Sequence, residues 1–205
     1  MQNQTCSGNE DNFPFGAVLA PGLCAQIYRK TQDLVNELSR PRSLYISKAK
    51  EVFCLERAGY YEEWANLTGY VMVYDDEGKD GTAETATVIA RKQRLDHGLA
   101  VTESHVYASS SEGVFRWPYT TGQRAEVDNS TMEVVVKDIP TALDQLHPTR
   151  TIIFDDTEEI LYVARGSEQN LDENDFFARI RRYNLTELPE GGFPWEDGEI
   201  VATGV

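Results

Sequence analysis

The chain has 205 residues, of which 40% are hydrophobic and 26% are charged, enough for one globular domain with its own core. A formal net charge of −15 argues against binding to nucleic acid or to an anionic membrane surface, since both need clustered lysine and arginine. No apolar run is long enough to cross a membrane, and the start of the chain lacks the pattern of a signal peptide.

Residues 1–41 precede the regular strand pattern. Within them, CAQIYRKTQDLVNEL fits either an amphipathic helix or, as we favour, an outer strand that closes a ring of sheets. Cys6 and Cys24 could pair if the compartment is oxidising. Cys54 lies in an apolar run and is predicted to be a buried small hydrophobic residue.

Four N-glycosylation sequons begin at the asparagines Asn3, Asn66, Asn129 and Asn184. Their number favours a secreted eukaryotic protein whose signal peptide is not part of this sequence.

From residue 42 onward, short apolar runs alternate with turn-forming clusters, which predicts strands. The runs form three sets of four strands. Phe53, Tyr107 and Tyr162 hold the same place in successive sets, about 55 residues apart. A four-stranded unit at a constant period indicates an all-β fold, a β-propeller with about three blades at 42–95, 96–146 and 147–205.

A closed propeller typically has four to eight blades, so three leave the ring open. This predicts either a partial or alternative product of a longer protein, or two copies that assemble into a six-bladed ring with two-fold symmetry.

The first strand of each propeller blade runs beside the central channel. Arg42, the pair Asp96 and His97, and the set His147, Thr149 and Arg150 each stand directly before such a strand. His147 is the best candidate base, because neutral imidazole can take a proton from a hydroxyl, and Arg150 could bind a cofactor carboxylate. The simpler alternative is a set of ordinary polar groups at strand ends.

Two further segments have open interpretations. Arg57, in LERAGYYEEW, could reach the channel mouth or form a surface ion pair. GSEQNLDEND lacks the spacing of an EF-hand and is better explained as a solvated acidic turn than as a calcium loop. The sequence contains no glycine-rich nucleotide loop, no CxxC pair and no GxSxG elbow.

Several segments together resemble the soluble PQQ-dependent sugar dehydrogenases, in particular the fungal pyranose dehydrogenase branch related to glucose/sorbosone dehydrogenases. They are SRPRSLYI with VFCLERAG, DHGLAVTESHVYASSSEGVFRWPY, HPTRTIIFDDTEEILYVARGSEQNLDEND and ARIRRYN. The resemblance covers nearly the whole chain and about the N-terminal half of the family's domain.

The resemblance implies a six-bladed propeller that binds pyrroloquinoline quinone (PQQ) and calcium at its axis and oxidises a sugar hydroxyl, with an external electron acceptor. It implies His147 as the base, Arg57 as a cofactor contact, Asp96 and His97 near the quinone, and Ser167 and Asn170 as orienting groups. Calcium ligands are expected beyond the end of this chain. We therefore expect the chain alone to bind the quinone poorly and to turn over little.

Two other functions remain open. One is a non-catalytic half-propeller that binds glycans, partners or a second copy of itself. The other is a calcium-dependent lactonase-like hydrolase, which the His- and Arg-rich channel positions disfavour, because a calcium site needs oxygen ligands.

Overall fold

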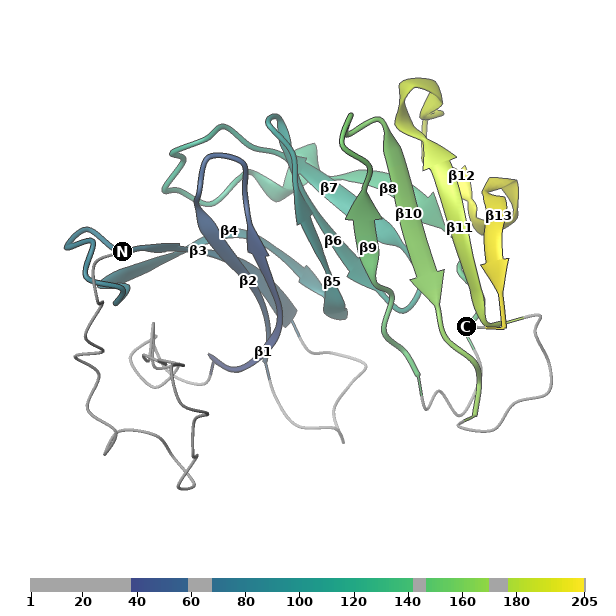
Figure 1. Cartoon of the computed structure of the whole chain (residues 1–205), viewed down its shortest axis with the longest axis horizontal. Coiled ribbons are helices and arrows are strands. Elements are labelled where there is room, and N and C mark those ends of the chain that lie inside the picture. Colours follow the sequence, from purple (N-terminus) through teal and green to yellow (C-terminus); the bar gives the residue numbers. More distant parts are fainter. Residues whose placement is uncertain (1–37, 59–67, 142–146, 170–176, 205) are drawn as a thin grey trace, which may run out of the picture.

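The computed structural model describes residues 38–58, 68–141, 147–169 and 177–204 (Figure 1). They form three sheets, each built on four strands that pair antiparallel in chain order, and a two-residue strand is added in parallel to the edge of the second sheet. The first sheet consists of β1 (Leu38–Ile46), β2 (Val52–Ala58), β3 (Thr68–Asp75) and β4 (Thr85–Gln93). The second contains β5 (Leu95–Val101), β6 (His105–Ser110), β7 (Val114–Pro118) and β8 (Glu133–Lys137). The third contains β9 (Ile152–Phe154), β10 (Ile160–Arg165), β11 (Arg179–Asn184) and β13 (Glu199–Thr203).

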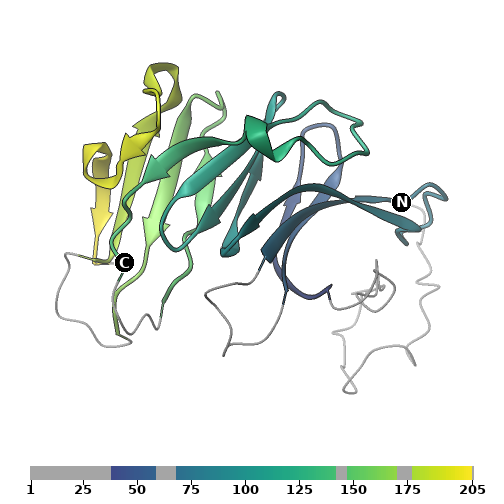
Figure 2. The ribbon, with the colours of Figure 1, turned by 180° about the vertical axis from the view of Figure 1, so that it is seen from behind.

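The three sheets lie side by side, with the second between the other two (Figures 1 and 2). Strands β1, β5 and β9 each form one edge of their sheet, and β5 contacts both β1 and β9. The sheets therefore meet along their first strands and fan outward, as propeller blades do. The predicted all-β fold with a four-stranded repeat is confirmed.

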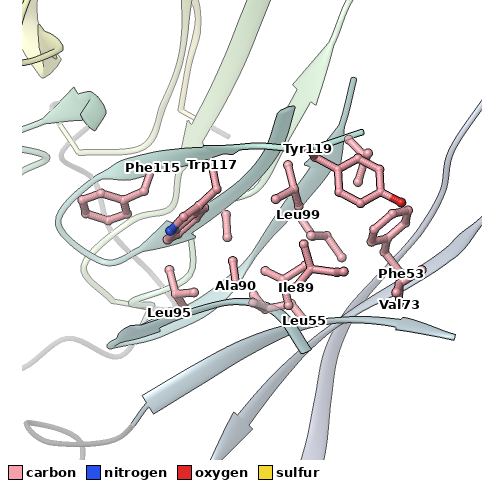
Figure 3. Close-up of a cluster of buried hydrophobic side chains, with 14 residues drawn as sticks. Phe53, Leu55, Val73, Ile89, Ala90, Leu95, Leu99, Phe115, Trp117 and Tyr119 are labelled. Carbon is pink, nitrogen blue, oxygen red and sulfur yellow. The ribbon is translucent and has the colours of Figure 1, made fainter. Parts of the chain in front are cut away.

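The contact between the first and second sheets is a large apolar core (Figure 3). Phe53, Leu55 and Val73 from the first sheet meet Leu99 and Trp117 from the second. All five are at most 4% exposed, which is typical of a close-packed interior. Period-two alternation explains the pattern, because residues 53 and 55 share one face of β2.

A second apolar core joins the second and third sheets. It contains Ala100 and Tyr107 from the second sheet and Ile152, Leu161 and Val163 from the third. The ring of Tyr107 packs edge-on against Phe154, with 4.8 Å between their centroids. The second sheet is thus buried on both faces.

One strand was not predicted. β12 (Phe193–Pro194) lies between β11 and β13 in sequence but pairs in parallel with β8, at the outer edge of the second sheet. It follows the short 3-10 helix η5 (Leu185–Glu187) and precedes η6 (Trp195–Asp197); a third, η4 (Asn129–Thr131), precedes β8.

Cys54 is 1% exposed and has a free thiol, as predicted. The proposed closing strand, Cys6, Cys24 and the sequons at Asn3 and Asn66 lie outside the described residues. In the part of the chain that the structure describes, no helix has the length and apolarity needed to cross a membrane.

Candidate functional site

The predicted site residues come from three sheets but lie at one end of them, the lower end in Figure 1. Arg57 is near the end of β2, and Asp96 and His97 are at the start of β5. His147 and Arg150 directly precede β9, and Ser167 follows β10. In each meander the first strand begins where the second ends, so the topology alone brings these positions together.

Asp96 links the first two sheets through two arginines. Its Oδ1 atom lies 2.9 Å from Nη1 of Arg57 and 3.4 Å from Nε of Arg42. Arg57 and Asp96 are only 5% and 6% exposed, so their ion pair is buried. The alternative prediction that Arg57 forms an ion pair on the surface is therefore wrong, because its ion pair is in the interior. Oδ2 of Asp96 is buried and has no hydrogen-bond partner among the described residues.

Arg150 is 1% exposed, and its guanidinium holds the backbone of its own segment. Nη1 donates to the carbonyls of His147 and Thr149, at 3.0 Å and 2.9 Å, and Nη2 donates to that of Pro140 at 3.4 Å. Nε of Arg165 donates to the same Pro140 carbonyl at 2.8 Å. The predicted contact of Arg150 with a cofactor carboxylate stays a prediction, and these bonds give the side chain a positioning role.

Arg150 also connects this segment electrostatically to Asp96. Burial lowers the pKa of Arg150 to about 10, with a further lowering by Arg165, while the charge of Asp96 opposes the shift. Four guanidinium groups, those of Arg42, Arg57, Arg150 and Arg165, are thus linked, because the first two pair with Asp96 and Arg150 interacts electrostatically with both Asp96 and Arg165. We call this group the arginine cluster. It is a local excess of positive charge in a chain whose net charge is −15.

His147 is half-buried and is oriented by the segment after β10. Its Nδ1 lies 2.9 Å from the backbone carbonyl of Ser167 and 3.5 Å from the hydroxyl of the same residue. A carbonyl can only accept, so the shorter contact places the proton on Nδ1 and makes Nε2 the basic nitrogen. The predicted pair of His147 and Ser167 is therefore in direct contact.

His97 lies beside Asp96 and differs from His147 in its surroundings. Its Nδ1 is buried without a hydrogen-bond partner among the described residues. Burial lowers the pKa of His97, and the positive charge of Arg42 lowers it further, while Asp96 acts in the opposite direction. This shift favours the neutral form of His97.

A close backbone approach holds the second and third sheets together at this end. The amide of Gly98 donates to Oγ of Ser109 at 2.8 Å, and that hydroxyl donates to the carbonyl of Arg150 at 2.6 Å. A Cβ atom at Gly98 would lie 2.3 Å from the Arg150 carbonyl oxygen, so only glycine fits. The register of His97 relative to Arg150 depends on this junction.

Sequence reasoning missed Arg165. A signal was present, because Arg165 stands at the end of the second strand of its sheet, as Arg57 nearly does in the first. Asn170, the remaining predicted residue, lies outside the described residues, as does most of the acidic segment that contains it.

The acidic groups that come close enough together to hold a metal lie elsewhere. Among the described residues, the group of this kind is Asp76, Asp80 and Glu84, in the turn between β3 and β4 at the other end of the first sheet. Asp76 already accepts hydrogen bonds from the amides of Asp80 and Gly81. These carboxylates are not part of the arginine cluster.

Comparisons with known proteins agree with this fold. Two structures of a Trichoderma reesei protein of Carbohydrate-Active Enzymes Family AA12, an iodide and a calcium structure, match with TM-scores of 0.63 and 0.64 at 23% and 22% identity. The holo form of the pyranose dehydrogenase PQQ domain from Coprinopsis cinerea matches with a TM-score of 0.63 at 21% identity.

Each match covers 82% of this chain but only 39–41% of the matched chain, so this chain spans about two-fifths of those structures. No curated protein matches significantly. The model of a protein family described as TrAA12-like matches residues 24–205. The predicted resemblance to the PQQ-dependent sugar dehydrogenases is confirmed, and the chain belongs to the TrAA12-like family.

Proposed function

We propose that this chain forms part of a PQQ-dependent dehydrogenase that oxidises a sugar hydroxyl. The observation that carries the proposal is the arginine cluster, which lies at the same end of the sheets as an oriented histidine base. The solved pyranose dehydrogenase domain is a PQQ domain, and the family membership of this chain supports the same cofactor.

The residues present fit such a cofactor. PQQ is a quinone with several carboxylates, and Arg42 and Arg57 are the guanidiniums beside Asp96 that would hold an anionic group. The buried Oδ2 of Asp96 and Nδ1 of His97 have hydrogen-bonding capacity that the described residues do not use. When bound, the quinone supplies the hydride acceptor.

His147 is the proposed general base. The carbonyl of Ser167 keeps its proton on Nδ1, so Nε2 can take the proton of the substrate hydroxyl. Arg150 positions His147 by binding its carbonyl oxygen. Ser167 acts through its backbone, and the predicted orienting role of Asn170 remains part of the proposal.

His97 is the second candidate for the base. Its lowered pKa favours the neutral imidazole, and its position next to Asp96 and Arg42 puts it at the arginine cluster. The alternative role, which the resemblance implies, is a contact with the quinone.

Other parts of the proposal come from the resemblance. They are a calcium ion with ligands outside this chain, an external electron acceptor and weak activity of this chain alone. Secretion is proposed from the sequons. Of the two that the structure describes, Asn129 is exposed and Asn184 is half-buried.

A titration of the purified chain with PQQ, with and without calcium, followed by calorimetry and absorbance, tests the proposal. We expect weak but saturable binding that Arg42→Gln weakens about tenfold further, as the loss of one charged contact would. Arg182→Gln is the matched control, since Arg182 pairs with Glu199 on the surface of the third sheet. No binding by the folded chain would favour the alternative of a non-catalytic half-propeller.

Reduction of a dye in the presence of PQQ and a sugar separates the two histidines. We expect His147→Gln to abolish the rate while PQQ binding persists. If His97→Gln abolishes the rate while PQQ binding persists, and His147→Gln does not, His97 is the base and His147 is not.

A further inference from the structure

A pocket of about 470 Å³ lies at the end of the sheets opposite the arginine cluster. Its walls are the turns that join the first and second strands of all three sheets, together with the segment after β7. These turns stand at the upper end of the ribbon in Figure 1. A volume of this size is typical of small-molecule sites.

Glu158, in the β9–β10 turn, contacts the corresponding turns of the other two sheets. Its Oε1 lies 2.7 Å from Nζ of Lys48, in the β1–β2 turn, and its Oε2 accepts a hydrogen bond of 3.3 Å from the amide of Glu103, in the β5–β6 turn. Glu158 has a φ of 61°, a left-handed conformation that a residue other than glycine keeps only when its surroundings enforce it. The pocket is therefore held in shape by contacts between sheets.

Glu51 fixes the opposite wall. Its carboxylate accepts hydrogen bonds from the Tyr119 hydroxyl at 2.9 Å, the Gly122 amide at 3.0 Å and Nη1 of Arg124 at 2.8 Å. Its side chain is 9% exposed. Because these partners belong to the second sheet and its loops, Glu51 locks the first sheet to the second beside the pocket.

The chemistry of the lining selects the class of ligand. Eight of the eleven lining residues bear a hydroxyl or a carboxylate, and three glutamates stand against one lysine, so phosphates and other anions are disfavoured. The three glutamates do not form a group close enough to hold a metal among the described residues. Fixed hydroxyl and carboxylate oxygens match the adjacent hydroxyls of a neutral sugar. The hydroxyl-bearing residues are Ser47, Thr102, Tyr119, Thr120 and Thr121.

We propose that this pocket binds a neutral saccharide, in a site separate from the arginine cluster. A smaller pocket of about 210 Å³ adjoins it and shares Thr102 and Glu158 with it. His105, Arg116 and Thr186 line the smaller pocket. Two adjoining pockets fit a ligand of two sugar units better than one unit, so cellobiose is the first probe.

Saturation-transfer NMR and calorimetry with cellobiose test the proposal on the chain without PQQ. We expect saturable binding that glucuronate, an anionic sugar, does not compete for. Thr121→Trp fills the pocket and should abolish binding, and Glu103→Gln should weaken it about tenfold by removing a charged acceptor. Glu77→Gln, on an exposed turn outside the pocket, is the control and should bind as the parent does.

Circular dichroism and thermal melting of the Thr121→Trp protein establish that it folds. Unchanged cellobiose binding by folded Thr121→Trp, or no binding by the parent, would overturn the proposal. Loss of cellobiose binding in Arg42→Gln alone would place the sugar at the other end and overturn it as well. Thr121→Trp should leave PQQ binding unchanged, so failure here and failure of the proposed dehydrogenase function are distinguishable.

Discussion

At the scale of single residues, Glu56 is a buried carboxyl that the proposed chemistry does not use. It is 0% exposed, accepts a hydrogen bond from the Tyr74 hydroxyl, and has an Oε2 atom without a hydrogen-bond partner among the described residues. Burial raises the pKa of Glu56 above its ordinary value of 4.5, and the Tyr74 bond only partly opposes this. Folding therefore shifts the balance of Glu56 towards its protonated form.

This shift predicts a pH dependence of stability. With a folded pKa above the unfolded one, the stabilising contribution of Glu56 is complete below pH 4.5 and is lost as the pH rises through the folded pKa. We expect Glu56→Gln, which keeps an acceptor for Tyr74, to become more stable relative to the parent as the pH rises from acidic to neutral. Urea unfolding of both proteins across that range measures the difference. A difference that is constant with pH would contradict the prediction.

Gly98 lies where the second and third sheets approach too closely for a side chain. A Cβ atom there would lie 2.3 Å from the Arg150 carbonyl oxygen and 2.5 Å from Oγ of Ser109. We expect Gly98→Ala to lower the free energy of unfolding by about 1–3 kcal/mol, as overpacking does, and to weaken PQQ binding.

Urea unfolding and the PQQ titration measure the two effects of Gly98→Ala. Gly78→Ala is the control, because its Cβ would meet only the carboxylate ends of two side chains, Glu84 at 3.2 Å and Asp80 at 3.8 Å. Equal stability of the two variants would show that the junction can relax.

At the scale of elements, β12 joins two sheets through two residues. Gly192 directly precedes it with a φ of 81°, and a Cβ there would lie 2.7 Å from the Val134 carbonyl oxygen. The loop between β11 and β13 can approach β8 this closely only because Gly192 has no side chain.

Gly192→Ala should therefore destabilise the chain more than Gly191→Ala does. Gly191 has nearly the same φ, 78°, but its Cβ would meet only Nζ of Lys137, at 3.8 Å. The two variants share the backbone strain, so their difference, about 1–3 kcal/mol, isolates the clash. Thermal and urea unfolding provide the comparison, and an indistinguishable pair would mean that β12 does not contribute to stability.

At the scale of the whole molecule, both outer faces of the three-sheet stack carry exposed apolar side chains. Leu44 and Ile46 on β1 are 71% and 65% exposed, and Ile153 on β9 is 61% exposed. Ile152 and Phe154 pack toward the second sheet, so Ile153 points away from it. Exposed apolar surface of this kind marks an interaction face.

These faces suit the proposed assembly of two copies into a larger ring. Size-exclusion chromatography with light scattering should find the parent chain self-associated. The double variant Leu44→Lys/Ile153→Lys should be monomeric, because a lysine in each face cannot be buried without loss of hydration. A parent that is monomeric at every concentration tested would rule out the homodimer.

Much of this molecule was predictable from local pattern. Twelve strand segments follow from apolar runs between turn residues, and the period through Phe53, Tyr107 and Tyr162 indicates the four-stranded unit. Cys54 could be placed in the interior because its neighbours in β2 are apolar. β12 escaped prediction because two residues carry no periodicity and their pairing with β8 is entirely non-local.

The candidate site was only half visible in the sequence. His147, Asp96 and Arg57 stand at strand ends, so their positions were predictable once the meander was recognised. The partners were not, since Arg57 and Asp96 are 39 residues apart and the carbonyl of Ser167 is contributed by backbone. The backbone role of Arg150 depends on the carbonyls of Pro140 and Thr149, which have no sequence signature.

The sequence by itself determined the all-β class, the repeat, the approximate positions of twelve strands and the end of the sheets where the polar residues lie, because these follow from side-chain alternation and chain direction. Only the tertiary structure decided which charges meet. Ion pairing between Asp96 and two arginines of another sheet, the joining of three turns by Glu158, and the burial of Glu56 depend on how the sheets pack. Such contacts between distant segments are set by packing geometry, which local residue pattern does not encode.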